Sequence, residues 1–188
     1  MKTIDKYLTE KLVINNKVKR NSWFPKSKEE LINDIITIIK NADKKRDVDL
    51  NCINVSDIED MSSVFSTVNK TQPVYKIDIS SWDLSKVKTT KNMFTGCRHL
   101  QVDTSMLDVS NIEDMQGMFF GCEKFNSDFK NWNVGKCKNF TGMFAGCKML
   151  DCDFSTWDLT DIDKSKTKWM FSNCSNLTNT QFPVGFKR

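Results

Sequence analysis

The sequence contains one histidine and three prolines, and it has no apolar run long enough to cross a membrane. The lone His99 excludes a zinc site with two histidines, and its neighbours Arg98 and Leu100 give no indication of a Ser-His-Asp triad. None of the seven cysteines belongs to a C-x-x-C pair, the spacing typical of four-cysteine zinc sites. Charges interrupt every apolar stretch well before the roughly 18 residues of a transmembrane helix. We therefore expect no catalytic residue, no metal site, no cofactor and no membrane insertion.

A secretory signal is also missing from the start of the sequence. Residues 1–20 carry charges throughout, so they lack the apolar core of about 7–15 residues that such a signal needs. The number of cysteines is odd, and without a signal we expect reduced thiols rather than disulfides. These features predict a cytoplasmic protein.

Charge divides the chain into two unequal parts. Residues 1–47 contain 12 basic and 7 acidic side chains, whereas residues 48–188 contain 16 and 17. The basic excess of the first part is interleaved with acids, which favours a solvated surface over a nucleic-acid site. We expect an N-terminal arm and a capping helix in 1–47. Residues 48–188 are expected to form a repeat domain with a C-terminal cap over 177–186.

The capping helix is predicted from a start signal and an apolar face. Ser27 and Glu30 form a capping box, in which each side chain satisfies a backbone amide of the first helical turn. The apolar side chains that follow have helical spacing and share one face: Leu31, Ile35, Ile38 and Ile39. This pattern predicts a helix over 27–42, and its apolar face requires a partner at the open end of the next domain.

A repeating unit organises the rest of the chain. A phenylalanine recurs at intervals of 29, 25, 25 and 27 residues, with a cysteine three residues after it in four of the five units. A large apolar residue, usually tryptophan, precedes it by 12 residues, or by 14 in the last unit. A period near 25 is in the range of leucine-rich repeats. Stacking would turn these positions into structural ladders of Phe65, Phe94, Phe119, Phe144 and Phe171, of Cys97, Cys122, Cys147 and Cys174, and of Trp82, Trp132 and Trp157.

Each unit combines a helical pattern with a short stretch that has no helical period. After a capping box, Ile112, Met115 and Phe119 follow one another with helical spacing, and Gly121 marks the expected helix end. The stretch 153–159 mixes apolar and short polar residues, which is typical of a strand. We therefore predict an α/β fold, a leucine-rich-repeat-like solenoid of about five 25-residue strand-helix units with an N-terminal helical cap.

The pattern W-D-[LV]-S-x-[VI]-x(5)-M-F-x-G-C-x-x-[LF] resembles the BspA-type leucine-rich repeat family, also described from Mycoplasma lipoproteins. Residues 82–87 with 93–97, residues 108–112 with 118–122, and their counterparts up to Cys174 carry the match, over about 70% of the chain. Family members are typically bacterial surface proteins proposed to adhere to host or matrix proteins, and short versions occur in bacteriophages. The resemblance implies a repeat scaffold, and the missing signal favours a phage-encoded member that acts in the infected cell or the virus particle.

Two repeated positions have both a functional and a structural interpretation. The recurring aspartates, such as Asp78 and Asp103, could form a calcium ladder, but aspartates also cap turns, and we favour turn caps. The tryptophans could form a platform for a carbohydrate or peptide. Ile53 and Leu107 occupy the same position in other units, which favours core packing.

These patterns predict a non-catalytic scaffold that binds a protein partner through a repetitive surface. A surface adhesin for matrix protein or glycan is one alternative, and a thiol-dependent enzyme is another. The oligomeric state is left open. The predicted partner-binding residues lie two positions before the large apolar residue of each unit: Ser80, Ser105, Lys130 and Ser155.

Overall fold

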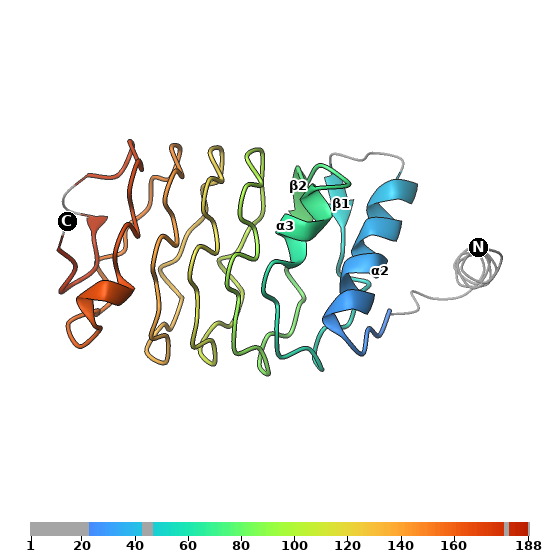
Figure 1. Ribbon diagram of the computed structural model, residues 1–188, viewed down its shortest axis with the longest axis horizontal. Helices are drawn as coiled ribbons and strands as arrows, with labels where there is room; N and C mark the ends of the chain where they lie inside the picture. The colour runs from blue at the N-terminus through green and yellow to red at the C-terminus, as the bar shows by residue number, and fades with distance from the viewer. Residues whose placement is uncertain (1–22, 43–46, 179–180, 188) are drawn as a thin grey trace.

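The computed structural model describes residues 23–42, 47–178 and 181–187. Their elements are, in chain order, helix α2 (Lys28–Asn41), strand β1 (Asp47–Asp49), helix α3 (Val64–Asn69), strand β2 (Lys76–Asp78) and the 3-10 helix η1 (Lys164–Lys166). Figure 1 shows the helices α2 and α3 near one end, followed by a row of chain layers that lie side by side. The predicted N-terminal arm falls mostly in residues 1–22, outside the described residues.

The helix predicted over 27–42 is present as α2. The Oγ of Ser27 accepts a hydrogen bond from the backbone amide of Glu30 at 3.2 Å, as in a capping box, whereas the carboxylate of Glu30 accepts from the amide of Lys26 at 2.8 Å instead of that of Ser27. Leu31, Ile35 and Ile39 are buried on one face and belong to the same hydrophobic core as the repeats. Because this face contacts the core, α2 lies against the N-terminal end of the row of layers (Figure 1).

The predicted solenoid of five strand-helix units is wrong. Within residues 47–178, the described structure contains one α-helix, α3, and one two-stranded parallel sheet, in which β1 pairs with β2. The other bridges between repeats are isolated parallel bridges, such as Thr89 with Asp114 and Asp114 with Asn139. The repeats therefore form layers that consist mostly of turns and extended chain, rather than strands and helices.

Left-handed residues explain why the helical pattern does not produce helices. Gly117 has a φ of 59° and Gly121 a φ of 69°, so right-handed helix cannot continue through this segment. The matching segments of the neighbouring layers carry Gly96 and Gly146 at the second of these positions, also with positive φ. The first layer has Thr67 there instead, and Thr67 is part of the helix α3. A helix forms only in the layer that lacks this second left-handed residue.

We call residues 90–97, 115–122, 140–147 and 167–174 the turn segments of the second to fifth layers. In the third layer the amides of Gly117, Phe119 and Gly121 donate to carbonyls of the fourth layer at 2.7–2.9 Å. The amides between them bond locally, as from Phe120 to the carbonyl of Gly117 at 3.0 Å. The same pattern joins the second layer to the third and the fourth to the fifth. Within the turn segments, the amides that leave a layer thus point toward the C-terminal end of the stack, and the carbonyls that receive them point toward its N-terminal end.

The core between the turn segments and the opposite side of the layers is filled by aromatic rings. The phenylalanines of successive turn segments stack with centroid distances of 4.8, 5.3, 5.6 and 5.5 Å, and four of the five are fully buried. Such ring pairs contribute about 0.5–1.5 kcal/mol each beyond their burial. This column, in chain order, consists of Phe65, Phe94, Phe119, Phe144 and Phe171.

The C-terminal segment covers one half of the last layer. The amide of Leu159 donates to the carbonyl of Val184 at 2.9 Å, and the amide of Val184 donates to Trp157 at 2.9 Å. Phe182 and Phe186 both pack against Phe171, with ring centroids 5.2 Å away. The backbone of this segment pairs with the tryptophan side of the last layer, and its two phenylalanine rings pack against the last turn segment. No helix among the described residues is long and apolar enough to cross a membrane.

Candidate functional site

Aspartates on the side opposite the turn segments cap one turn in every layer. In each case the Oδ1 atom accepts a hydrogen bond from the backbone amide two residues later, at 2.8–2.9 Å. This is the turn-capping interaction expected of aspartate, and it fixes the direction of each carboxylate. The calcium-ladder interpretation is not needed to explain the row. The pairs are Asp49 with Asn51, Asp78 with Ser80, Asp103 with Ser105, Asp128 with Lys130 and Asp153 with Ser155.

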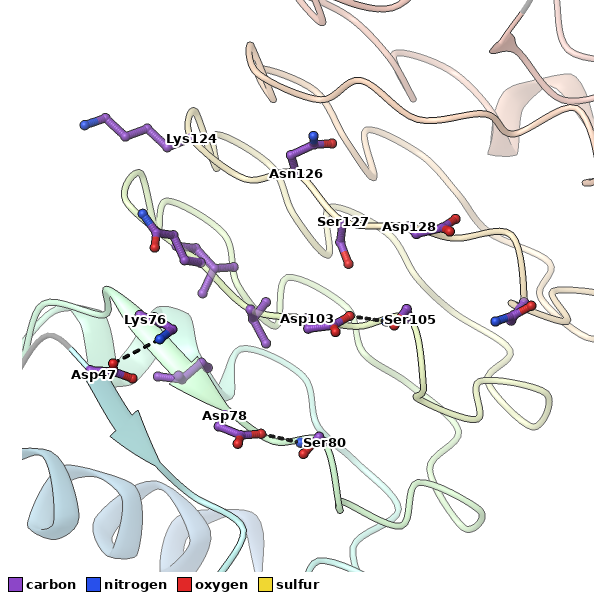
Figure 2. A pocket seen from close by; sticks show the side chains of 15 residues that line it. Asp47, Lys76, Asp78, Ser80, Asp103, Ser105, Lys124, Asn126, Ser127 and Asp128 are labelled. Carbon is purple, nitrogen blue, oxygen red and sulfur yellow. Dashed lines mark hydrogen bonds and ion pairs between the residues drawn. The ribbon is translucent and has the colours of Figure 1, made fainter.

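A groove follows this row of turns across the layers. Its first part has a volume of about 940 Å³ and extends from Asp47 and Lys76, on β1 and β2, to Asp128 (Figure 2). A second hollow of about 610 Å³ begins at Asn126 and ends near Asp153. The two parts share Asn126 and Asp128 in their lining, so they form one channel along the stack. We call this channel the aspartate groove.

Negative charge predominates in the aspartate groove. Its lining contains six aspartates and three lysines. Hydrogen bonds from Asn51 and then Ser80 lower the pKa of Asp78, and those from Ser105 lower the pKa of Asp103. Asp78 and Asp103 therefore stay ionised to lower pH than an ordinary aspartate, and the excess of carboxylates attracts basic groups.

Each predicted partner-binding residue is the one whose backbone amide donates to the capping aspartate of its turn. Ser80 and Ser105 line the first part of the groove (Figure 2), and Lys130 lines the second. Ser155 is exposed in the same column, one layer farther on, and its amide donates to Asp153. The structure thus brings three of the four residues to one channel.

Sequence reasoning missed a second column of groove residues, two positions before each capping aspartate. These side chains are exposed, and some are linked across layers, as Lys76 is to Asp47 at 2.9 Å. The signal was present in the alternation of exposed and buried residues in β1 and β2, which places both polar positions on the same outer face. The column contains Asp47, Lys76, Gln101, Asn126 and Asp151.

The cysteine column has a structural role that its spacing alone did not reveal. Each thiol donates to the carbonyl of the column phenylalanine one layer earlier, at 3.0 Å from Cys122 to Phe94 and at 3.1 Å from Cys147 to Phe119. Cys174 makes the same contact with Phe144 at 3.0 Å. Cysteine is small enough for the interior and still provides a weak donor there.

Burial makes these thiols poor nucleophiles at neutral pH. Desolvation raises the pKa of Cys97 to about 12 and that of Cys174 to about 11. The half-buried Cys152, which lines the aspartate groove, has its pKa raised to about 12 by burial and by neighbouring aspartates. A thiolate is the reactive form of cysteine, so this environment disfavours a thiol-dependent reaction.

The tryptophan column lies in the core instead of forming an exposed platform. Trp82, Trp132 and Trp157 are at most 5% exposed. Each indole Nε1 donates to a carbonyl of the preceding layer, for example from Trp132 to Thr104 at 2.8 Å. The tryptophans thus satisfy buried carbonyls and join adjacent layers.

The chain matches the model of a known protein family. The family described as "Mycoplasma protein of unknown function, DUF285" matches residues 59–182, about two thirds of the chain. The chain therefore belongs to this family. Comparison with curated proteins gave no match, and comparison with solved structures gave none either.

Proposed function

We propose that this chain is a non-catalytic protein-binding module whose aspartate groove holds a basic, extended segment of a partner protein. The observation that carries the proposal is a channel lined by six aspartates and three lysines, with capping aspartates in successive layers. A peptide in extended conformation advances about 3.3 Å per residue and can follow such a channel over several layers.

Rigidity supports a binding role for the groove. The floor of the groove is built on layers whose aromatic core is continuous, and each capping carboxylate is held by a backbone amide. Groups that are fixed before binding lose little conformational freedom when a partner arrives. Complementary charge increases the rate of encounter and favours basic over acidic partners.

Two finer features belong to the same proposal. We assign the repeats to the BspA-type group within the wider family because of the Trp-Asp-Leu-Ser and Met-Phe-x-Gly-Cys positions, as at Trp82 and Phe94. A cytoplasmic location is supported by the seven cysteines, which are all free thiols in the structure.

The test uses variants that remove charge without removing the turns. Asparagine can replace a capping aspartate, since Asn133 already accepts the amide of Gly135 at 3.1 Å in an equivalent turn. The groove variant combines Asp78→Asn, Asp103→Asn and Asp128→Asn. The control combines Asp83→Asn, Asp108→Asn and Asp158→Asn, which cap turns outside the groove lining.

The probe is a fluorescein-labelled eight-residue peptide of alternating Lys and Thr. Its affinity, measured by fluorescence anisotropy, should fall by about tenfold in the groove variant, since each exposed ion pair contributes about 0.2–1 kcal/mol. The control should lose about twofold or less. Amide shifts at Ser80, Ser105 and Lys130 should locate the peptide by NMR. Equal losses in both variants, or an absence of shifts in the groove, would refute the proposal.

A further inference from the structure

The last turn segment that the structure describes, residues 167–174, has amides that receive no acceptor from a further described layer. Trp169, Phe171 and Asn173 stand where Gly142, Phe144 and Gly146 stand one layer earlier. The amides of those three earlier residues donate to carbonyls of the last layer at 2.9, 2.8 and 2.7 Å. In the last layer itself, the described part of the chain provides no acceptor for the corresponding three amides. The stack thus ends in a row of outward-facing donors, like the edge of a sheet.

A hollow with basic side chains lies over this edge. It has a volume of about 780 Å³, and Lys164, Lys168 and Lys187 line it together with the rings of Trp169 and Phe186. None of the described residues that line it is acidic. Amides of successive residues with alternating handedness form anion-binding concavities, and here the inter-layer amides of the turn segments all point toward the end of the stack at which the hollow lies. Both the backbone and the side chains therefore favour a negatively charged occupant.

Trp169 gives a second, independent indication of a ligand. Its φ is 57°, a conformation that is rarely adopted by bulky residues, and its side chain is 69% exposed. The equivalent residues of the earlier layers are Ser63, Asn92, Gly117 and Gly142, all small. A strained, exposed aromatic ring next to free amides does not help the fold, and such strain is concentrated at functional sites. The ring offers a flat apolar surface to a chain that lies along the edge.

The occupant is not a second copy of this chain. The opposite end of the stack, toward which the carbonyls point, is covered by α2 (Figure 1). Two copies that met at their C-terminal ends would place donors against donors and lysines against lysines. The chain's own residues 181–187 already pair with the tryptophan side of the last layer. The occupant must bring carbonyl oxygens and negative side chains to this edge.

We propose that the last turn segment binds an extended acidic segment of a partner protein, which adds a further layer to the stack. Its carbonyl oxygens accept from the amides of Trp169, Phe171 and Asn173. Its acidic side chains pair with Lys168 and Lys187. This surface is distinct from the aspartate groove and has the opposite charge preference, so either proposal can fail without the other.

The experiment uses two fluorescein-labelled eight-residue peptides, one of alternating Glu and Thr and one of alternating Lys and Thr. The acidic peptide should slow the hydrogen exchange of the Trp169, Phe171 and Asn173 amides at least tenfold at saturation. The amides of Gly117 and Phe119, which are bonded within the stack, should not change. The basic peptide should leave all five amides unaffected.

Two variants and a matched control separate the site from general charge effects. Lys168→Glu should weaken the acidic peptide at least fivefold, whereas Lys130→Glu, an equal change of charge at an exposed position in the aspartate groove, should weaken it less than twofold. Trp169→Gly should also weaken binding without lowering the melting temperature, since glycine accepts this backbone conformation.

Three results would overturn the inference. Equal affinities in the two lysine variants would mean that the peptide binds by charge alone. Tighter binding of labelled oligo-dT than of the acidic peptide, with the same amides protected, would assign the edge to nucleic acid. Protection that increases with protein concentration without any peptide, together with a dimer in sedimentation, would assign it to a second copy.

Discussion

The two ends of the stack differ in how they are completed. At the N-terminal end α2 covers the first layers with Leu31, Ile35 and Ile39, and its Lys28 pairs with Asp60 at 2.6 Å. At the C-terminal end the backbone of residues 181–187 pairs with the tryptophan side, and only the rings of Phe182 and Phe186 reach the last turn segment, which is left with three free amides within the described structure. The hydrogen bonds between turn segments run in one direction, so a cover for one end cannot serve the other. The open end is therefore a consequence of backbone polarity.

The largest expected effect concerns the closed end. Ile35→Ala removes a fully buried side chain from the face of α2 and should cost about 3 kcal/mol, because the helix and the first layer cannot close the resulting cavity completely. Phe186→Ala, at the other end, truncates a partly buried ring and should cost about 1 kcal/mol. Urea denaturation measures both free energies of unfolding. If the two substitutions cost the same, the ends are equally well covered and the contrast between them is wrong.

Sequence patterns predicted the closed end better than the layers. The capping box at Ser27 is local, so the helix could be located from a few neighbouring residues. The spacing of Ile112, Met115 and Phe119 suits a helix, but it equally suits a turn segment, in which amides bond to the next layer. The decisive conformations are those of Gly117 and Gly121, and glycine inside a helical pattern was interpreted only as its end.

The free amides could not be predicted from the sequence for the same reason. Whether an amide is satisfied depends on a residue about 25 positions later, and the repeat does not show on which side the last layer stays open. The columns of phenylalanine, cysteine and tryptophan were recognisable because each recurs with nearly the same residue type. The groove column at Lys76 and Gln101 changes residue type in every layer, so only the alternation of burial identifies it.

A smaller loss of folding stability should appear at alkaline pH. The thiol ionisation that causes it should differ between the interior of the stack and its open end. The folded thiol of Cys97 has a pKa of about 12, against an ordinary 9.0, so the unfolded chain loses this proton first. Stability from this thiol is complete below about pH 9 and declines as the pH rises toward 12. Between about pH 8.5 and 10.5 the loss is about 2 kcal/mol, since one pKa unit corresponds to about 1.4 kcal/mol.

The measurement is urea denaturation of the wild type and of Cys97→Ala at both pH values, in which the variant should lose less stability by that amount. At the open end burial raises the pKa of Cys174 only to about 11. Cys174 should therefore ionise about one pH unit before Cys97 when thiolate absorbance is followed in single-thiol variants of the folded protein. Simultaneous ionisation would show that the last layer is as well shielded from water as the second.

The smallest changes in the free energy of unfolding should come from two substitutions at equivalent positions, with opposite signs in the interior and at the open end. Gly142 has a φ of 61°, and a Cβ added there meets only the ring of Phe120 at 3.8 Å, so Gly142→Ala should cost about 1–2 kcal/mol from backbone conformation alone. Trp169 holds the equivalent conformation at the open end with a side chain that is 69% exposed, and Trp169→Gly should stabilise the protein by about 1 kcal/mol. Thermal and urea denaturation would measure both changes. Glycine at position 169 would thus give a more stable protein than tryptophan. A ligand that contacts the ring explains why tryptophan is present there. If Trp169→Gly destabilises the protein by as much as Gly142→Ala, the ring supports the fold, and the strain at this position is no argument for a binding edge.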